Sequence, residues 1–190
     1  FTLHTSEWTG PGPAQFLIDD WKAIGIRVVL RDRTRRLFGT EQGTLVHDLS
    51  VWSSMSEYAP LLSPRNFVPF NRGSFYAPGY GSWYALGGLA DPNSKVIKDR
   101  PLAMEPPIGS AFRRSQVLYS QALVTADRAE QIAIMRQILD SAAENLWTIS
   151  ICTSPPQPIV VSTRLRNVPS TAIAGTIFFT PANTGIETFY

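Results

Sequence analysis

Residues 14–30 read AQFLIDDWKAIGIRVVL and predict a helix that leads directly into a strand. The apolar side chains of the first part recur with helical spacing, at Leu17, Trp21 and Ile24. Gly25 follows where helices commonly end in a left-handed residue, and the apolar run 26–30 is typical of a strand buried on both faces. Because residues 1–8 alternate like a strand, the N-terminal region predicts a βαβ unit with a right-handed crossover.

The same alternation of helix and strand continues along the chain. A second helix is predicted over about 34–41, and the basic cluster RDRTRR (31–36) is typical of its solvated start. The run LSVW (49–52) predicts a third strand. These elements together predict an α/β fold with a mixed or parallel sheet flanked by helices.

The second half of the chain predicts two longer helices. The first covers about 110–123, and the second begins near Asp127, whose side chain can cap it. The apolar face predicted for the second helix consists of Ile132, Met135, Leu139, Ala142 and Leu146. Strands are predicted at 147–152 and 158–162, on either side of a proline-rich turn.

A long aromatic-rich tract, residues 53–110, separates these two regions and shows no sustained helical period. Such long irregular tracts are usually functional or folded into packed loops. We expect its aromatic rings to pack against the sheet, and residues 91–107 to form its most exposed segment.

Composition narrows the classes of function. The 190 residues suit one domain or two small ones, and a net charge of +2 is too small to indicate a nucleic-acid partner. No run approaches the ~20 apolar residues of a membrane span. The chain opens at Phe1 without a signal-peptide pattern, so we expect it to be part of a longer protein.

Signals for catalysis are weak. His4, predicted in an edge-like strand, and His47, in a loop before a strand, are the only histidines, and both suit structural roles. Cys152 is predicted to be an inert core thiol because no cation neighbours it. No metal site or cofactor is predicted, and the pair Gly87–Gly88 lacks a phosphate-binding pattern. One enzymatic alternative stays open, a glycoside-active domain that uses Glu57.

Signals for binding lie at the end of the third predicted strand. Ligands of open α/β sheets bind at the carboxyl ends of the strands. An indole ring beside hydroxyls and one carboxylate suits a neutral polar ligand. The predicted ligand contacts are Trp52, Ser53, Ser54, Glu57 and Tyr58, with Trp83 and Tyr84 behind them. Core packing of Trp52, and loop packing of Trp83 and Tyr84, remain alternatives.

Three stretches resemble the family 5 extracellular solute-binding proteins, the dipeptide and oligopeptide receptors of bacterial ABC importers. FLIDDWKAIGIRVVLRDRTRRLF (16–38) resembles the helix and strand signature of that family. HDLSVWSSMSEYAPLLSPRNF (47–67) resembles its next strand and its D-P-x-x-F segment. Residues 127–169 resemble its late helix and returning strand, whereas 71–109 match least.

The resemblance implies a lobe of the periplasmic-binding-protein type II fold. Residues 1–190 would be the second, C-terminal lobe, with about 153–190 as the return segment on the hinge side and the first lobe absent from this chain. The protein would bind an oligopeptide or oligosaccharide between two lobes, close about the hinge and deliver the solute to a membrane permease. It would be a receptor and not an enzyme, located in the periplasm or outside the cell, with or without a lipid anchor.

The chain departs from the family pattern at one position. Peptide-binding members usually carry an aspartate shortly after the tryptophan of this strand, where it pairs with the α-amino group of the peptide. Here Met55 stands three residues after Trp52, and Glu57 is the nearest acid. A shift of two residues along an extended chain moves a carboxylate by several ångströms. This departure favours neutral ligands, oligosaccharides in particular, and leaves peptides as the other option.

Overall fold

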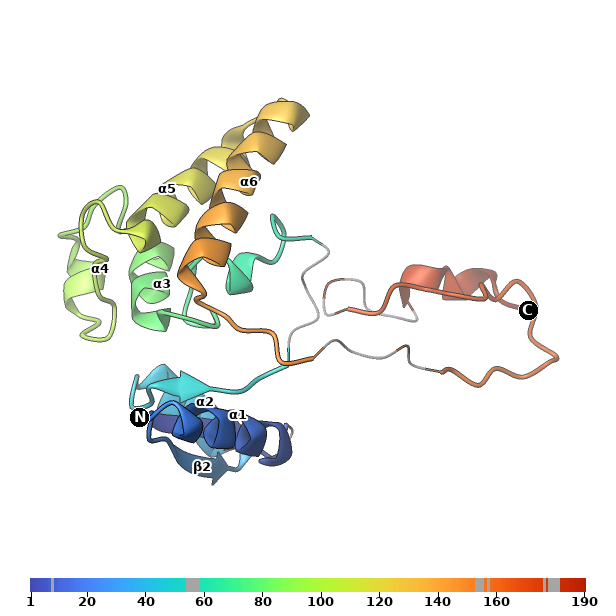
Figure 1. Cartoon of the computed structure of the whole chain (residues 1–190). Helices are drawn as coiled ribbons and strands as arrows, with labels where there is room; N and C mark the ends of the chain where they lie inside the picture. Colours follow the sequence, from blue (N-terminus) through green and yellow to red (C-terminus); the bar gives the residue numbers. More distant parts are fainter. Residues whose placement is uncertain (8, 54–58, 153–155, 157, 176, 178–181) are drawn as a thin grey trace.

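The computed structural model describes residues 1–7, 9–53, 59–152, 156, 158–175, 177 and 182–190. Figure 1 shows three parts. We name them the α/β unit (residues 1–53), the helical unit (59–147) and the C-terminal segment (148–190). The C-terminal segment extends away from the other two parts (Figure 1).

The α/β unit holds a parallel sheet. Its elements are β1 (Thr2–Ser6), α1 (Gly12–Ala23), β2 (Val29–Arg33), α2 (Arg35–Gly43) and β3 (Leu49–Ser50). The three strands have the order β2-β1-β3, and both pairings are parallel. The predicted α/β fold is therefore confirmed, as is the start of α2, where the Thr34 side chain accepts a hydrogen bond from the Leu37 amide.

Two details of this sheet correct the sequence-based prediction. The strand β2 begins at Val29, and Val29 is 49% exposed, so a strand at 26–30 buried on both faces is wrong. The strand β1 lies in the centre of the sheet and not at its edge, which leaves His4 only 1% exposed. An apolar run becomes buried only where other elements cover it. In the described sheet β2 is an edge strand that pairs with β1 alone.

The helical unit packs its two long helices against a loop. Its elements are η1 (Pro64–Asn66), α3 (Pro78–Ala85), α4 (Lys95–Lys98), α5 (Ala111–Val124) and α6 (Arg128–Asn145). The core residues are Val68, Tyr119, Ala122, Met135 and Ile138. The predicted cap of α6 is confirmed, because the Asp127 carboxylate accepts a hydrogen bond of 2.7 Å from the Glu130 amide.

The buried face of α6 differs from the predicted one. Met135 is buried as expected, but the second fully buried position is Ile138, which the prediction omitted. Ile132 and Leu146 are exposed, and their inclusion in the face is wrong. The buried positions of α6 are Met135 and Ile138, and a broad apolar pattern could not locate them to within one residue.

The described rings of the aromatic tract pack against helices. They meet Phe112 in α5 and Trp147, two residues after α6: Tyr76 stacks on Trp147 with centroids 5.6 Å apart, and Phe112 lies 4.3 Å from Trp147. The helix α3 inside this tract was not predicted, because Gly79 and Gly81 weaken helix propensity. Close packing explains Gly81, since a Cβ there would overlap the carbonyl oxygen of Asn71.

The C-terminal segment lacks the predicted strands. The described residues of 147–152 and 158–162 belong to no strand, and Ile149 and Val160 are exposed. Cys152 is exposed too, so its prediction as a core thiol is wrong. Strands need a neighbour to accept their backbone hydrogen bonds, and an apolar sequence does not supply one. The short helices here are η2 (Ala182–Thr184) and η3 (Ile186–Thr188).

Candidate functional site

The parallel sheet brings the ends of its strands to one side of the α/β unit. We name this side the carboxyl edge and define it by Ser6, Glu7, Arg33, Trp52 and Ser53. The Val51 amide donates a hydrogen bond of 2.9 Å to the His4 carbonyl, so pairing with β1 continues to the residue before Trp52. The sheet therefore holds the backbone at Trp52 in place.

The Trp52 side chain is half-buried against α2. Its ring stacks on Phe38, with centroids 5.0 Å apart and planes inclined by 20°. The guanidinium carbon of Arg35 lies 5.9 Å from the centroid of the indole. Phe38 is buried in the core, whereas the indole that packs on it stays partly exposed. Such an anchored ring is suited to offer its remaining surface to a flat apolar group.

Of the other residues predicted after Trp52, the structure describes only Ser53, which is exposed. Ser54, Glu57 and Tyr58 lie outside the described residues, and their roles stay predictions. The glycoside-active alternative rests on Glu57 and has the same standing.

Sequence reasoning missed one residue at the carboxyl edge, Glu7. Glu7 follows β1 directly, and its Oε1 accepts a hydrogen bond of 3.2 Å from the Arg35 amide in the first turn of α2. A carboxylate there offsets the positive end of the helix dipole. Glu7 could have been found by its position alone, because the residue after a central parallel strand lies at the same edge as Trp52.

A buried polar cluster lies between the sheet and α2. His4 Nδ1 is 3.0 Å from Glu41 Oε2, and the Arg33 Nε donates to the same carboxylate at 3.0 and 3.2 Å. The His47 ring lies 5.5 Å from that of His4. Burial lowers the pKa of both histidines, which favours their neutral forms. The cluster joins β1 and β2 to α2.

Trp83 and Tyr84 belong to α3 in the helical unit and do not join the carboxyl edge. Trp83 is fully buried, with the Arg113 guanidinium 4.4 Å from its ring centroid. A Cβ on Gly88 would overlap the same ring, so the glycine is needed for this packing. Tyr84 shares a hydrogen bond of 2.8 Å with Ser120 on α5. In this structure both rings pack between helices.

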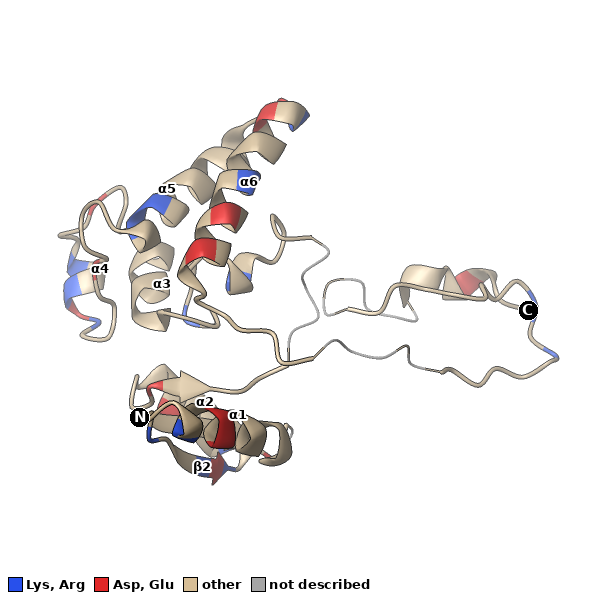
Figure 2. Cartoon of the chain, viewed as in Figure 1, with Lys and Arg blue, Asp and Glu red and all other residues tan. Residues whose placement is uncertain are grey.

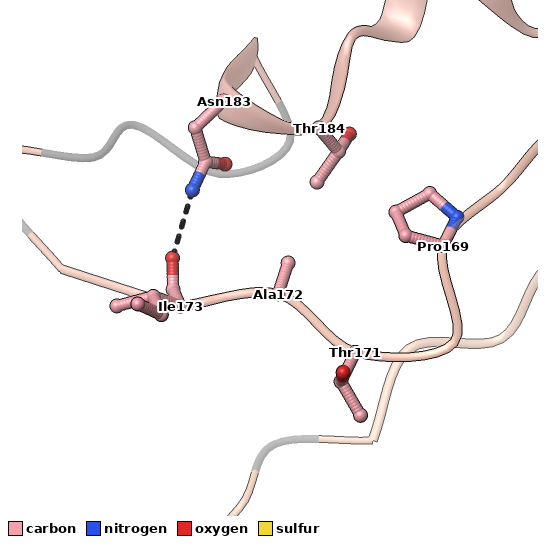
Figure 3. Close-up of a pocket in the computed structure, with 6 residues that line it drawn as sticks. All are labelled: Pro169, Thr171, Ala172, Ile173, Asn183 and Thr184. Atoms are coloured by element: carbon pink, nitrogen blue, oxygen red, sulfur yellow. Dashed lines mark hydrogen bonds between the residues drawn. The ribbon is translucent and has the colours of Figure 1, made fainter.

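A hollow with a volume of about 390 Å³ lies in the C-terminal segment. Figure 3 shows the residues that line it. It is lined by Pro169, Thr171, Ala172, Ile173, Asn183 and Thr184. Asn183 Nδ2 donates a hydrogen bond of 2.9 Å to the Ile173 carbonyl across it. None of the described residues that line the hollow carries a charge or an aromatic ring.

Among the described residues, no group of three or more His, Cys, Asp or Glu side chains could hold a metal ion. In the same part of the chain, no helix is long and apolar enough to cross a membrane.

The chain holds a small parallel sheet flanked by helices, with a helical unit after it. The chain is similar in structure to the oligopeptide-binding protein OppA, with a TM-score of 0.70 and 23% sequence identity. The match covers 100% of this chain and 30% of that protein, so this chain spans less than a third of its structural neighbour. No family model and no curated protein match the sequence. The similarity confirms the predicted fold.

Proposed function

We propose that this chain is the second lobe of a solute-binding protein that serves an ABC importer, and that its carboxyl edge is one wall of the ligand cleft. The observation that carries the proposal is the position of Trp52. The half-buried indole stands at the carboxyl end of a parallel strand, anchored on Phe38. The similarity to a binding protein supports a receptor over an enzyme.

The ligand class we propose is an oligopeptide or an oligosaccharide. The exposed Ser53 hydroxyl and the indole supply one hydrogen-bonding group and one apolar surface, which suit either class. The name of the structural neighbour favours a peptide. The replacement of the usual aspartate by Met55 favours a neutral sugar.

In the proposed mechanism, the ligand bridges this lobe and a first lobe and stabilises the closed form. Its effect is limited by the difference between its affinities for the closed and open forms. If each lobe contributes ~4 kcal/mol, one lobe alone binds at about millimolar Kd, and both together reach about micromolar Kd. The 190-residue chain alone should therefore bind weakly.

Calorimetry against a panel of peptides and β-linked oligosaccharides tests the proposal. The panel is titrated into the 190-residue chain and into a longer protein that contains it together with the other lobe. We expect micromolar binding of one ligand class by the longer protein only, and at least a tenfold loss with Trp52→Ala. The matched control is Trp21→Ala, which removes a half-buried indole of α1 near the opposite end of the sheet.

Two results would contradict the proposal. Micromolar binding by the 190-residue chain alone would show that the site is not divided between lobes. Unchanged affinity in the Trp52→Ala protein would show that the carboxyl edge does not contact the ligand. The same titrations, analysed for released products, detect turnover, which a receptor does not catalyse.

A further inference from the structure

A second and larger hollow lies where the α/β unit meets the helical unit. We name it the inter-unit cavity; its volume is about 550 Å³, within the roughly 300–1,000 Å³ of small-molecule sites. One wall is the connection between α2 and β3, at residues 43–45. The other walls are residues 71–72, α3 with the residue after it, and the segment 99–103. The two units thus enclose it together.

The inter-unit cavity lies away from the carboxyl edge. The helix α2 begins at Arg35, beside Trp52, and ends at Gly43, which lines the cavity. Its nine residues extend about 13 Å at 1.5 Å per residue. A ligand in the cavity would therefore occupy a different site from the solute proposed above.

Close contacts hold the walls in place. A Cβ on Gly43 would overlap the Arg72 guanidinium, so that group lies flat against the end of α2. A Cβ on Gly79 would lie 3.2 Å from Leu45 Cδ1, so the Leu45 side chain reaches α3. Leu45 has a positive φ of 61°, a conformation that residues with side chains adopt at a cost in free energy. Strained residues of this kind occur preferentially at ligand sites.

The charges around the cavity are predominantly positive. Arg72, Asp99 and Arg100 line it, which leaves one net positive charge. Within the part of the chain that the structure describes, neither guanidinium group makes an ion pair or a side-chain hydrogen bond. Basic residues also gather on the adjacent α4 (blue in Figure 2). Guanidinium groups bind carboxylates with two parallel hydrogen bonds, so a single carboxylate complements this wall.

The apolar part of the cavity is aliphatic. Leu45, Leu86 and Leu102 line it, and none of the described lining residues is aromatic. Aliphatic walls offer nothing for ring stacking but exclude water from an alkyl chain. We propose that the inter-unit cavity binds a small aliphatic carboxylate, with its alkyl chain against the three leucines and its carboxylate at Arg72 and Arg100.

The probes are hexanoate, octanoate and decanoate, with octanol and octylamine as neutral and cationic analogues of the middle acid. Each is titrated into the 190-residue chain by calorimetry and by thermal shift. We expect saturable octanoate binding that tightens roughly fourfold per added methylene until the cavity is filled. Octylamine should bind at least tenfold more weakly than octanoate, because the wall is positive.

Variants locate the binding. Arg72→Ala and Arg100→Ala should each weaken octanoate binding about tenfold or more and leave octanol unchanged. Arg136→Ala, which removes an exposed arginine of α6, is the matched control and should have no effect. Ala85→Phe should fill the cavity and abolish binding, whereas Ala143→Phe on the exposed side of α6 should not.

Three results would overturn the proposal: no saturable binding of any acid below about 5 mM, equal binding of octylamine and octanoate, or equal losses with Arg136→Ala and Arg72→Ala. If Ala85→Phe fails to fold, the arginine variants still decide the question. Trp52→Ala should leave octanoate binding unchanged, so failure of this site and failure of the proposed solute cleft are separate outcomes.

Discussion

Gly81→Ala should destabilise the helical unit, although alanine is the better helix former. A Cβ at this position would overlap the carbonyl oxygen of Asn71 and lie 2.8 Å from its carbonyl carbon, where ordinary contacts are 3.4–4 Å. The obstacle is backbone, so no rotamer change relieves it. Overpacking of this kind costs about 1–3 kcal/mol, and the gain in helix propensity offsets about 1 kcal/mol. From the upper end of that range, we expect a net loss of about 2 kcal/mol.

Gly39→Ala is the matched control. Gly39 lies inside α2, and a Cβ there would meet nothing within 4 Å. This substitution should stabilise the chain by about 0.5–1 kcal/mol through helix propensity alone. The assay is urea denaturation followed by circular dichroism at 222 nm, with thermal unfolding as a second measure. The melting temperature should fall by about 4–8 °C with Gly81→Ala and rise by about 1–4 °C with Gly39→Ala. A Gly81→Ala protein as stable as Gly39→Ala would refute the close approach of α3 to Asn71.

Three further predictions concern stability. The pKa values of His4 and His47 are lowered from 6.5 in the folded chain, so the unfolded chain binds more protons below that pH. Stability should be full above about pH 6.5 and fall as the pH drops toward the lowered values, and a double histidine-to-glutamine variant should show a flatter profile in urea titrations. Ile138→Ala should cost about 2–5 kcal/mol and Ile132→Ala less than about 0.5 kcal/mol; a larger cost for Ile132→Ala would place the buried face of α6 where the sequence predicted it. Asp127→Ala should cost about 1 kcal/mol by removing the cap of α6, and an unchanged urea midpoint would argue against that cap.

The parts of the fold that could be predicted from the sequence are those that depend on residues close together in the chain. The cap at Asp127 and the left-handed Gly25 follow from local hydrogen bonding and backbone sterics, and the structure confirms both. The βαβ order could be read because strands and helices have different apolar periods. The central position of β1 could not, because strand order depends on contacts between residues far apart in the chain.

The candidate site was predictable to a similar extent. The rule that ligands meet the carboxyl ends of strands identified Trp52, and the structure places that residue at the carboxyl edge. It could not distinguish an aromatic ring that packs from one that binds. Trp83 was predicted as a ligand contact, with loop packing as the alternative, and its ring is fully buried beside Gly88 and Arg113. The sequence shows that an aromatic ring is present, but tertiary contacts decide whether that ring is buried.

The separation of the carboxyl edge from the inter-unit cavity has a measurable consequence. Trp52 stacks on Phe38, and the Arg72 guanidinium lies against Gly43, five residues or about 7.5 Å further along α2. Substitutions more than about 7–10 Å apart add in their effects on the free energy of unfolding to within about 0.5 kcal/mol. Trp52→Ala and Arg72→Ala should therefore be additive in urea denaturation of the double variant. A coupling of 1 kcal/mol or more, on the order of that seen for contacting residues, would show that α2 transmits strain between its ends. The two sites would then have to be treated as one system.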